Sequence, residues 1–272
     1  MKKILVPTDF SDHANNAVRY AINIGNYFEA EIELIHVYEM KTIIGSTSLV
    51  KEYLKENSER DLADNIRSFK ELIFGNTILN SRAINGNPID VICSIANNEE
   101  FDIIVMATQG VSGLREIFLG SKTSGVMKRT HIPILVIPNR FTYRPIKNII
   151  FAVDSGIVAD ENVLHLLLEL SKAYKSTIKI LHLEKEKMVT GYDPGINILL
   201  GAIPHSFHKF SGSHDVNGVI NLFVFEENSD MLCMVRRDRD FWSNLFHQSI
   251  TMKEVFDSPV PLLILRDVFF EK

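Results

Sequence analysis

Short runs of apolar residues alternate with amphipathic segments along the first half of this chain. The runs are rich in Ile, Val and Leu, which is typical of buried strands. Between them, apolar residues recur every three or four positions, as in helices that cover one face of a sheet. Because strands and helices alternate, the pattern predicts a parallel, doubly wound α/β sheet. The five predicted strands are Lys3–Val6, Ile32–Tyr38, Thr77–Ile84, Phe101–Met106 and Ile132–Ile137.

Four helices are predicted between these strands. The first is expected to be capped by Ser11 or Asp12 and to end near Gly25 or Glu29. The other three are expected within Ser48–Phe74, from Asn87-Pro88 onward with proline in the first turn, and over Ser124–Thr130.

The longest of these helices is expected to be amphipathic along its whole length and to end at Gly75-Asn76. Its predicted inner face comprises Leu49, Tyr53, Leu54, Leu62, Ile66, Phe69, Leu72 and Ile73.

The second half of the chain repeats the first. The run KNIIFAVD at Lys147–Asp154 matches KKILVPTD at Lys2–Asp9, and IKILHL at Ile178–Leu183 matches IELIHV at Ile32–Val37. An ordered series of matches like this indicates an internal duplication and therefore two sheets of five strands each. A constant shift of 128 positions pairs Asp102 with Asp230, Met106 with Met234, Phe118 with Phe246, Ser121 with Ser249, Thr123 with Thr251, Pro133 with Pro261 and Leu135 with Leu263.

The duplication predicts a domain at 1–139, a polar linker at 140–146 and a second domain at 147–272. The second copy is shorter by 17 residues, because the shift falls from 145 at its start to 128 at its end. The missing residues fall where the first copy has its long helix. In their place stands Glu184–Gly212, which contains several glycines and prolines and is predicted to be loop with at most a short helix.

A glycine-rich loop, MATQGVSGLREIFLGSKT at Met106–Thr123, leaves a predicted strand and enters a predicted helix. Backbone N–H groups and a helix N-terminus are aimed at a phosphate by loops of this kind. Asp9 also follows a strand directly, so both features belong on the ligand-binding edge of the sheet. Two alternatives remain: the glycines only let a helix pack, and Asp9 only caps the first helix.

The corresponding loop of the second copy has lost its glycines. Gly110 and Gly120 are replaced by Asp238 and Gln248. A carboxylate repels phosphate, and residues other than glycine disfavour positive-φ turns. We therefore expect the second domain to bind no phosphate and to be structural or regulatory.

Composition excludes several classes of protein. The net charge of −5, without a basic run, argues against nucleic acid as a partner. No run of 18 apolar residues predicts a membrane span. The two cysteines, Cys93 and Cys233, lack metal or redox spacing, which favours the reducing cytoplasm.

Other candidate residues have simpler interpretations. His36 and His182 lie inside apolar strands and are expected to be hydrogen-bonded core residues rather than catalysts. His205, His208 and His214 lack the carboxylate or cysteine that would complete a metal site. Arg236, Arg237 and Arg239, interleaved with Asp238 and Asp240, are predicted to form a solvated face. Because no catalytic triad or Walker loop is present, dedicated catalysis is not supported.

The ordered combination of PTD after the first strand, the LIHV strand, the [GA]-x2-G-x9-G-[ST] loop and the IPILVIP strand resembles the universal stress protein family. The resemblance covers most of residues 1–138 and, more faintly, 147–266. It implies the adenine nucleotide α-hydrolase-like strand order 3-2-1-4-5. It also implies an ATP site, with ADP or AMP as related ligands and Mg²⁺ bound through the phosphates. The residues implied are Pro7, Thr8, Asp9, Val37, Met106, Ala107, Gly110, Gly120, Ser121, Lys122 and Thr123.

Two positions depart from the family pattern. Ala107 replaces a common glycine, and Lys122 stands where valine is usual, so Lys122 either contacts phosphate or is a solvated surface charge.

The resemblance further implies a cytoplasmic nucleotide-dependent sensor or binding module in stress response. Its two domains are expected to pair through their fifth strands as an intrachain pseudo-dimer, and a homodimer and an unknown protein partner are also possible. One alternative is a slow ATPase that uses the same site. Another is a non-nucleotide interaction module that acts through the second domain and its Gly191–Gly212 segment.

Overall fold

The structure is a computed structural model, which describes residues 1–40, 48–108, 121–139, 141–153, 161–184, 194–211, 216–236 and 258–267. Among these residues, those up to Tyr143 form one compact unit and those from Arg144 onward form a second. No helix in the described ranges is long and apolar enough to cross a membrane.

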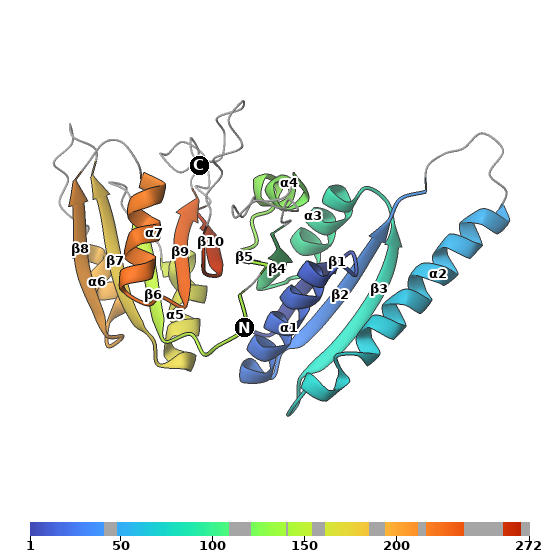
Figure 1. The fold of residues 1–272 in the computed structure, drawn as a ribbon, viewed down its shortest axis with the longest axis horizontal. Coiled ribbons are helices and arrows are strands. Elements are labelled where there is room, and N and C mark those ends of the chain that lie inside the picture. Colours follow the sequence, from blue (N-terminus) through green and yellow to red (C-terminus); the bar gives the residue numbers. More distant parts are fainter. Residues whose placement is uncertain are drawn as a thin grey trace. The chain divides into compact units, whose positions relative to one another are not determined.

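The described part of the first unit is a parallel sheet of five strands with the order β3-β2-β1-β4-β5 (Figure 1). Its right-handed crossovers place α1 and α2 on one face, and α3 and α4 pack together on the other. The strands are β1 (Lys3–Thr8), β2 (Glu31–Tyr38), β3 (Ile78–Asn85), β4 (Ile103–Ala107) and β5 (Ile134–Ile137). The helices are α1 (Asp12–Phe28), α2 (Ser48–Arg67), α3 (Pro88–Asn98) and α4 (Ser121–Arg129), with a 3₁₀ turn η1 at Lys70–Leu72.

Caps define both ends of α1. Of the two predicted N-caps it is Ser11 whose hydroxyl accepts a hydrogen bond from the N–H of Ala14, at 3.2 Å. At the other end Glu29 adopts a left-handed φ of 51° and its N–H bonds to the carbonyl of Gly25, which closes the helix. The chain then turns directly into β2.

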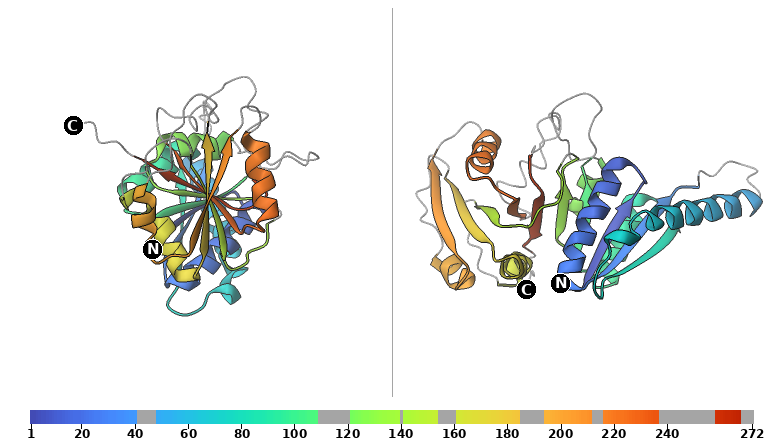
Figure 2. Two further views of the ribbon diagram at one scale, coloured as in Figure 1. Left: turned by 90° about the vertical axis from the view of Figure 1, so that its left-hand side faces the viewer. Right: turned by 60° about the horizontal axis from the view of Figure 1, so that its bottom comes forward.

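The second unit has the same architecture in its described residues. Its strand order β8-β7-β6-β9-β10 is that of the first unit, strand for strand, and its pairings are parallel. In Figure 2, α5 and α6 lie on one face of this sheet and α7 lies on the other. The strands are β6 (Asn148–Val153), β7 (Thr177–Glu184), β8 (His205–Ser211), β9 (Met231–Arg236) and β10 (Leu262–Arg266), and the helices are α5 (Glu161–Tyr174), α6 (Pro194–Leu200) and α7 (Val216–Glu226).

Strand registers match between the two units. Ile4 pairs with Ile103 as Ile149 pairs with Met231, which reproduces the shifts of 145 and 128 found in the sequence. One anchor is also shared: Oδ2 of Asp230 accepts two backbone N–H groups at the start of β6, at 2.8 and 2.9 Å, as Asp102 does at the start of β1. The duplication therefore extends from residue types to hydrogen bonds.

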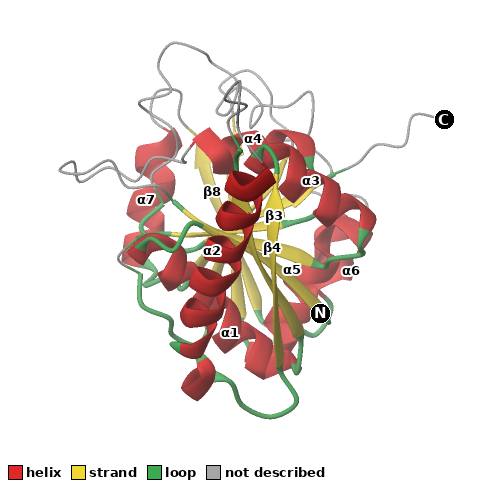
Figure 3. Cartoon of the chain, turned by 90° about the vertical axis from the view of Figure 1, so that its right-hand side faces the viewer, coloured by secondary structure: helices red, strands yellow, loops and turns green. Residues whose placement is uncertain are grey.

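The prediction for the longest helix was wrong in two respects. Helix α2 ends at Arg67 rather than at Gly75, and η1 follows it. Tyr53, assigned to the inner face, is 64% exposed, and Leu54 is also exposed, whereas Leu62 and Phe69 are buried. The helix lies along the outer side of this unit, and its first turns extend past the end of β3, so they have no sheet to cover (Figures 1 and 3).

The prediction for Glu184–Gly212 was also wrong, because this segment contains β8 as well as the short helix α6. Strand β8 pairs with β7 along its whole length, from Ile178 opposite His205 onward. The glycines and prolines of this segment favour loop when the sequence is considered locally. The edge of β7, however, offers unpaired backbone N–H and C=O groups, and β8 forms by pairing with them.

The segment predicted as a linker packs at both ends. The amide of Asn16 donates to the carbonyl of Phe141 at 3.1 Å, and Tyr143 packs edge-on against Tyr20. Further along, the guanidinium of Arg144 contacts Oδ1 of Asp230 at 2.6 Å. Its described residues are therefore anchored by side chains rather than solvated throughout.

We predict that Asp230→Ala destabilises the protein more than Asp102→Ala. The Asp230 side chain is only 9% exposed and binds the half-exposed Arg144 as well as two partly buried N–H groups, so its loss leaves these donors without their acceptor. The expected loss is about 2 kcal/mol and comes mainly from the two N–H groups, because the ion pair with the half-exposed Arg144 contributes little. The more exposed Asp102 should lose less, and urea unfolding of both variants would measure this. Equal losses would show that burial of the second anchor has no energetic role.

Candidate functional site

A pocket opens at the carboxyl ends of β1, β2 and β4, between the N-termini of helices on the two faces of the sheet. This is the point where the winding of a doubly wound sheet reverses. Eight of the eleven predicted site residues line it: Pro7, Thr8, Asp9, Val37, Met106, Ala107, Lys122 and Thr123.

The other three predicted residues are not among the lining residues. Ser121 begins α4 and is exposed beside the pocket residue Lys122. Gly110 and Gly120 lie outside the described residues.

Sequence reasoning missed seven lining residues. They come mainly from the first turns of α1 and α3, which begin at the same edge of the sheet. Because helices in parallel sheets start at the carboxyl ends of strands, the predicted first turns of these helices could have identified the missed residues from the sequence. The seven are Ser11, His13, Ala14, Ile35, Pro88, Ile92 and Thr108.

Asp9 is held in place by the cap of α1. Its Oδ1 accepts hydrogen bonds from the Ser11 hydroxyl at 2.6 Å and from the Ser11 N–H at 3.2 Å. Partial burial raises the pKa of Asp9, but these two bonds and the positive charge of Lys122 outweigh it, so the pKa lies below its usual value. The group is therefore a carboxylate at neutral pH, and it both supports the helix cap and lines the pocket.

The turn that leaves β1 is fixed by side chains of neighbouring elements. Phe10 adopts a left-handed φ of 64°, which is uncommon for a bulky residue. Its N–H donates to the Thr8 hydroxyl at 3.1 Å, and its ring stacks on His36 at 4.3 Å between centroids. A ring nitrogen of His36 in turn lies 2.9 Å from the Thr8 carbonyl. His36 is thus hydrogen-bonded, as predicted, but it is half-buried rather than a core residue.

Helix α4 is tied to β4 at its first turn. The buried Thr123 hydroxyl donates to the carbonyl of Ala107 at 3.2 Å. This bond holds the N-terminus of α4 against the strand end, where unpaired amides create a partial positive charge. Lys122 adds a full positive charge at the same place.

The pocket is chemically divided. On the side of β2 and α3 the lining is apolar, from Ile35, Val37, Pro88 and Ile92. On the side of α1 and α4 it is polar, from Asp9, Ser11, His13, Lys122 and Thr123. Such a pocket suits a ligand with a flat apolar part and an anionic part.

One prediction for the second unit was wrong. Arg236 is only 5% exposed, as the last residue of β9, so it does not belong to a solvated face. Arg236 is buried because it ends β9, where it pairs with Arg266 of β10. The alternating charges that follow it in the sequence do not determine its exposure. Those charges, Arg237–Asp240, and Gln248 lie outside the described residues.

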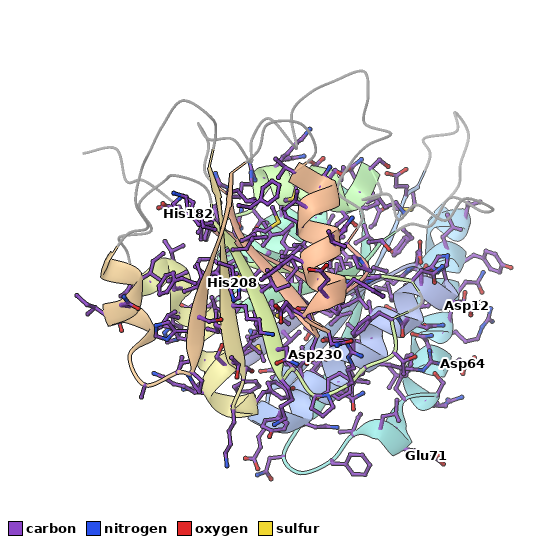
Figure 4. All side chains as sticks on the ribbon, turned by 60° about the vertical axis from the view of Figure 1, so that its left-hand side comes forward. Asp12, Asp64, Glu71, His182, His208 and Asp230 are labelled. Carbon is purple, nitrogen blue, oxygen red and sulfur yellow. The ribbon has the colours of Figure 1, made fainter. Side chains whose placement is uncertain are left out.

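Two histidines of the second unit, His205 and His208, have protein partners. His205 lies within 2.8 Å of the Asn197 amide oxygen, and His208 lies 2.8 Å from the Ser206 hydroxyl. Figure 4 shows His182 and His208 on the neighbouring strands β7 and β8, and His182 is buried. Within the described ranges no three His, Cys, Asp or Glu side chains are grouped for a metal ion, and His214 lies outside them.

Comparison with known proteins places these features in a family. The model of the universal stress protein family matches residues 1–138. Universal stress protein MJ0531 of Methanocaldococcus jannaschii is 35% identical over 141 residues, which cover 50% of this chain and 81% of that protein. Universal stress protein MJ0577 of the same organism is 31% identical over 157 residues, covering 51% and 96%.

A solved structure extends the likeness to both units. A universal stress protein from Archaeoglobus fulgidus matches 97% of this chain and 96% of its own, with a TM-score of 0.72 at 19% identity, which shows a common fold. With the matched first half, the shared strand order and the pocket at its switch point, this chain belongs to the universal stress protein family.

Proposed function

We propose that the first unit binds an adenine nucleotide, ATP with Mg²⁺ in particular, and that the chain acts as a nucleotide-dependent sensor or binding module in stress response. The observation that carries this proposal is the divided pocket, which combines an apolar wall with a carboxylate, a lysine and a helix N-terminus.

The lining suggests how a nucleotide would be held. The apolar wall formed by Val37 and Ile92 suits the adenine base, and the Asp9 carboxylate suits the ribose hydroxyls or a phosphate-bound Mg²⁺. Amides at the start of α4 and the Lys122 ammonium suit the phosphates. One carboxylate is sufficient for Mg²⁺, because this ion usually keeps several waters and takes its remaining ligands from phosphate.

The second unit is proposed not to bind nucleotide. Its sequence has lost both loop glycines, and it buries Arg236 at the end of β9. Pairing of the two domains through their fifth strands, homodimer formation and a cytoplasmic location remain predictions from the family resemblance.

We predict one nucleotide site per chain. Purified protein that is denatured and extracted should release adenine nucleotide, and calorimetry with nucleotide-free protein should give one Mg-ATP per chain. Absence of heat, together with no competition from ADP or AMP up to millimolar concentrations, would refute the proposal. A stoichiometry of two would refute only the assignment of the second unit.

We also predict that Lys122→Ala weakens ATP binding about tenfold, the size expected for a hydrogen bond to a charged group. Affinity for adenosine, which has no phosphate, should not change. Lys128→Ala, in the last turn of the same helix, is the matched control and should bind both ligands as the wild type does. Calorimetry with both ligands measures this, and equal losses for ATP and adenosine would argue against a phosphate contact.

A further inference from the structure

A buried hydroxyl in the pocket has no partner among the described residues. Thr108 follows β4 directly, its N–H donates to the carbonyl of Ile137 at 3.1 Å, and the residue is only 4% exposed. Its Oγ1 makes no hydrogen bond within the described structure, yet the residue lines the pocket. A buried hydroxyl without a partner is destabilising, and native proteins retain few of them.

We propose that Thr108 is a ligand-binding residue, whose hydroxyl donates a hydrogen bond to an oxygen in the sugar–phosphate part of the bound nucleotide. The inference rests on the proposed function of this pocket and adds a binding residue to it. Among the residues that the structure describes, the hydroxyl has no hydrogen-bond partner, so a bond to the ligand replaces no contact with any of them.

The sheet order indicates which part of the nucleotide Thr108 meets. The apolar wall contains Ile35 and Val37 of β2, whereas Thr108 follows β4, and β1 lies between these strands. Two strand spacings are about 10 Å. A base resting on β2 therefore lies too far from Thr108 to bond to it, and the sugar and phosphates extend toward β4 and α4.

The second unit carries a large side chain at the equivalent position. Ala107 pairs with Ile137 as Val235 pairs with Leu265, so Thr108 and Arg236 occupy equivalent places, each next along its chain. Arg236 is also buried. The fold thus accepts an arginine here, and the small threonine of the first unit is not required for packing.

The direct test is Thr108→Val, which replaces the hydroxyl by a methyl group of similar size. Because an unpaired buried hydroxyl is removed, thermal stability without ligand should stay the same or rise. The affinity for Mg-ATP should fall about tenfold, the effect of one hydrogen bond. Thr108→Ser keeps the hydroxyl and should retain wild-type affinity, and Thr108→Ala tests the same loss if the valine variant does not fold.

Thr77→Val is the matched control. Thr77 is also buried, at 7% exposure, with an Oγ1 that lacks a partner in the described residues, but it does not line the pocket. Its substitution should leave nucleotide affinity unchanged. If Thr77→Val weakened ATP binding as much as Thr108→Val, the effect would be a general one on folding and the inference would be overturned.

Thr108→Arg introduces the residue type that the second unit has at the equivalent position, Arg236. The variant should fold, as circular dichroism and thermal unfolding can show, and it should lose measurable Mg-ATP binding. If the wild type binds ATP and Thr108→Val binds it equally well, the role of Thr108 is refuted while the proposed function stands. If the wild type binds no nucleotide, the proposed function is refuted, and this inference with it.

Discussion

Parallel pairing of β1 with β2 on one side and β4 on the other is the constraint on which the site depends. Since parallel strands end at one edge, this pairing gathers Asp9, Val37 and Met106, which are far apart in the sequence, around one pocket. The strand order also puts the reversal of winding beside β1. Helices therefore leave this edge on both faces, and α1, α3 and α4 contribute their first turns to the lining.

Local hydrogen bonds convert that edge into a defined surface. The same Ser11 hydroxyl accepts from the helix N–H of Ala14 and donates to Asp9, so helix capping and orientation of the carboxylate are one arrangement. The two interpretations of Asp9 that the sequence left open, capping and ligand contact, are thus not exclusive. Thr123 has the parallel role at α4, where its hydroxyl joins the helix start to β4.

The two units show that fold and site are separable. Both units have the same strand registers and the same aspartate anchor, Asp102 in the first and Asp230 in the second. These contacts stabilise the sheet and involve no ligand. Two features predicted to bind a ligand are not preserved: the loop glycines are lost from the sequence of the second copy, and the pocket residue Thr108 corresponds to Arg236. Because the sheet tolerates these replacements, structural need does not explain the glycines and the small threonine of the first unit.

The sequence by itself determined the alternation of strands and helices and the duplication, and it predicted eight of the residues that line the pocket. These features are local or repeated, so periodicity and spacing express them. Only the tertiary structure decided that the edge of β7 recruits β8, that the first turns of α2 extend past the sheet, and that Arg236 is buried. It also decided that Thr108 lies buried in the pocket without a partner in the described residues. Each of these depends on neighbours from distant parts of the chain, which no local pattern records.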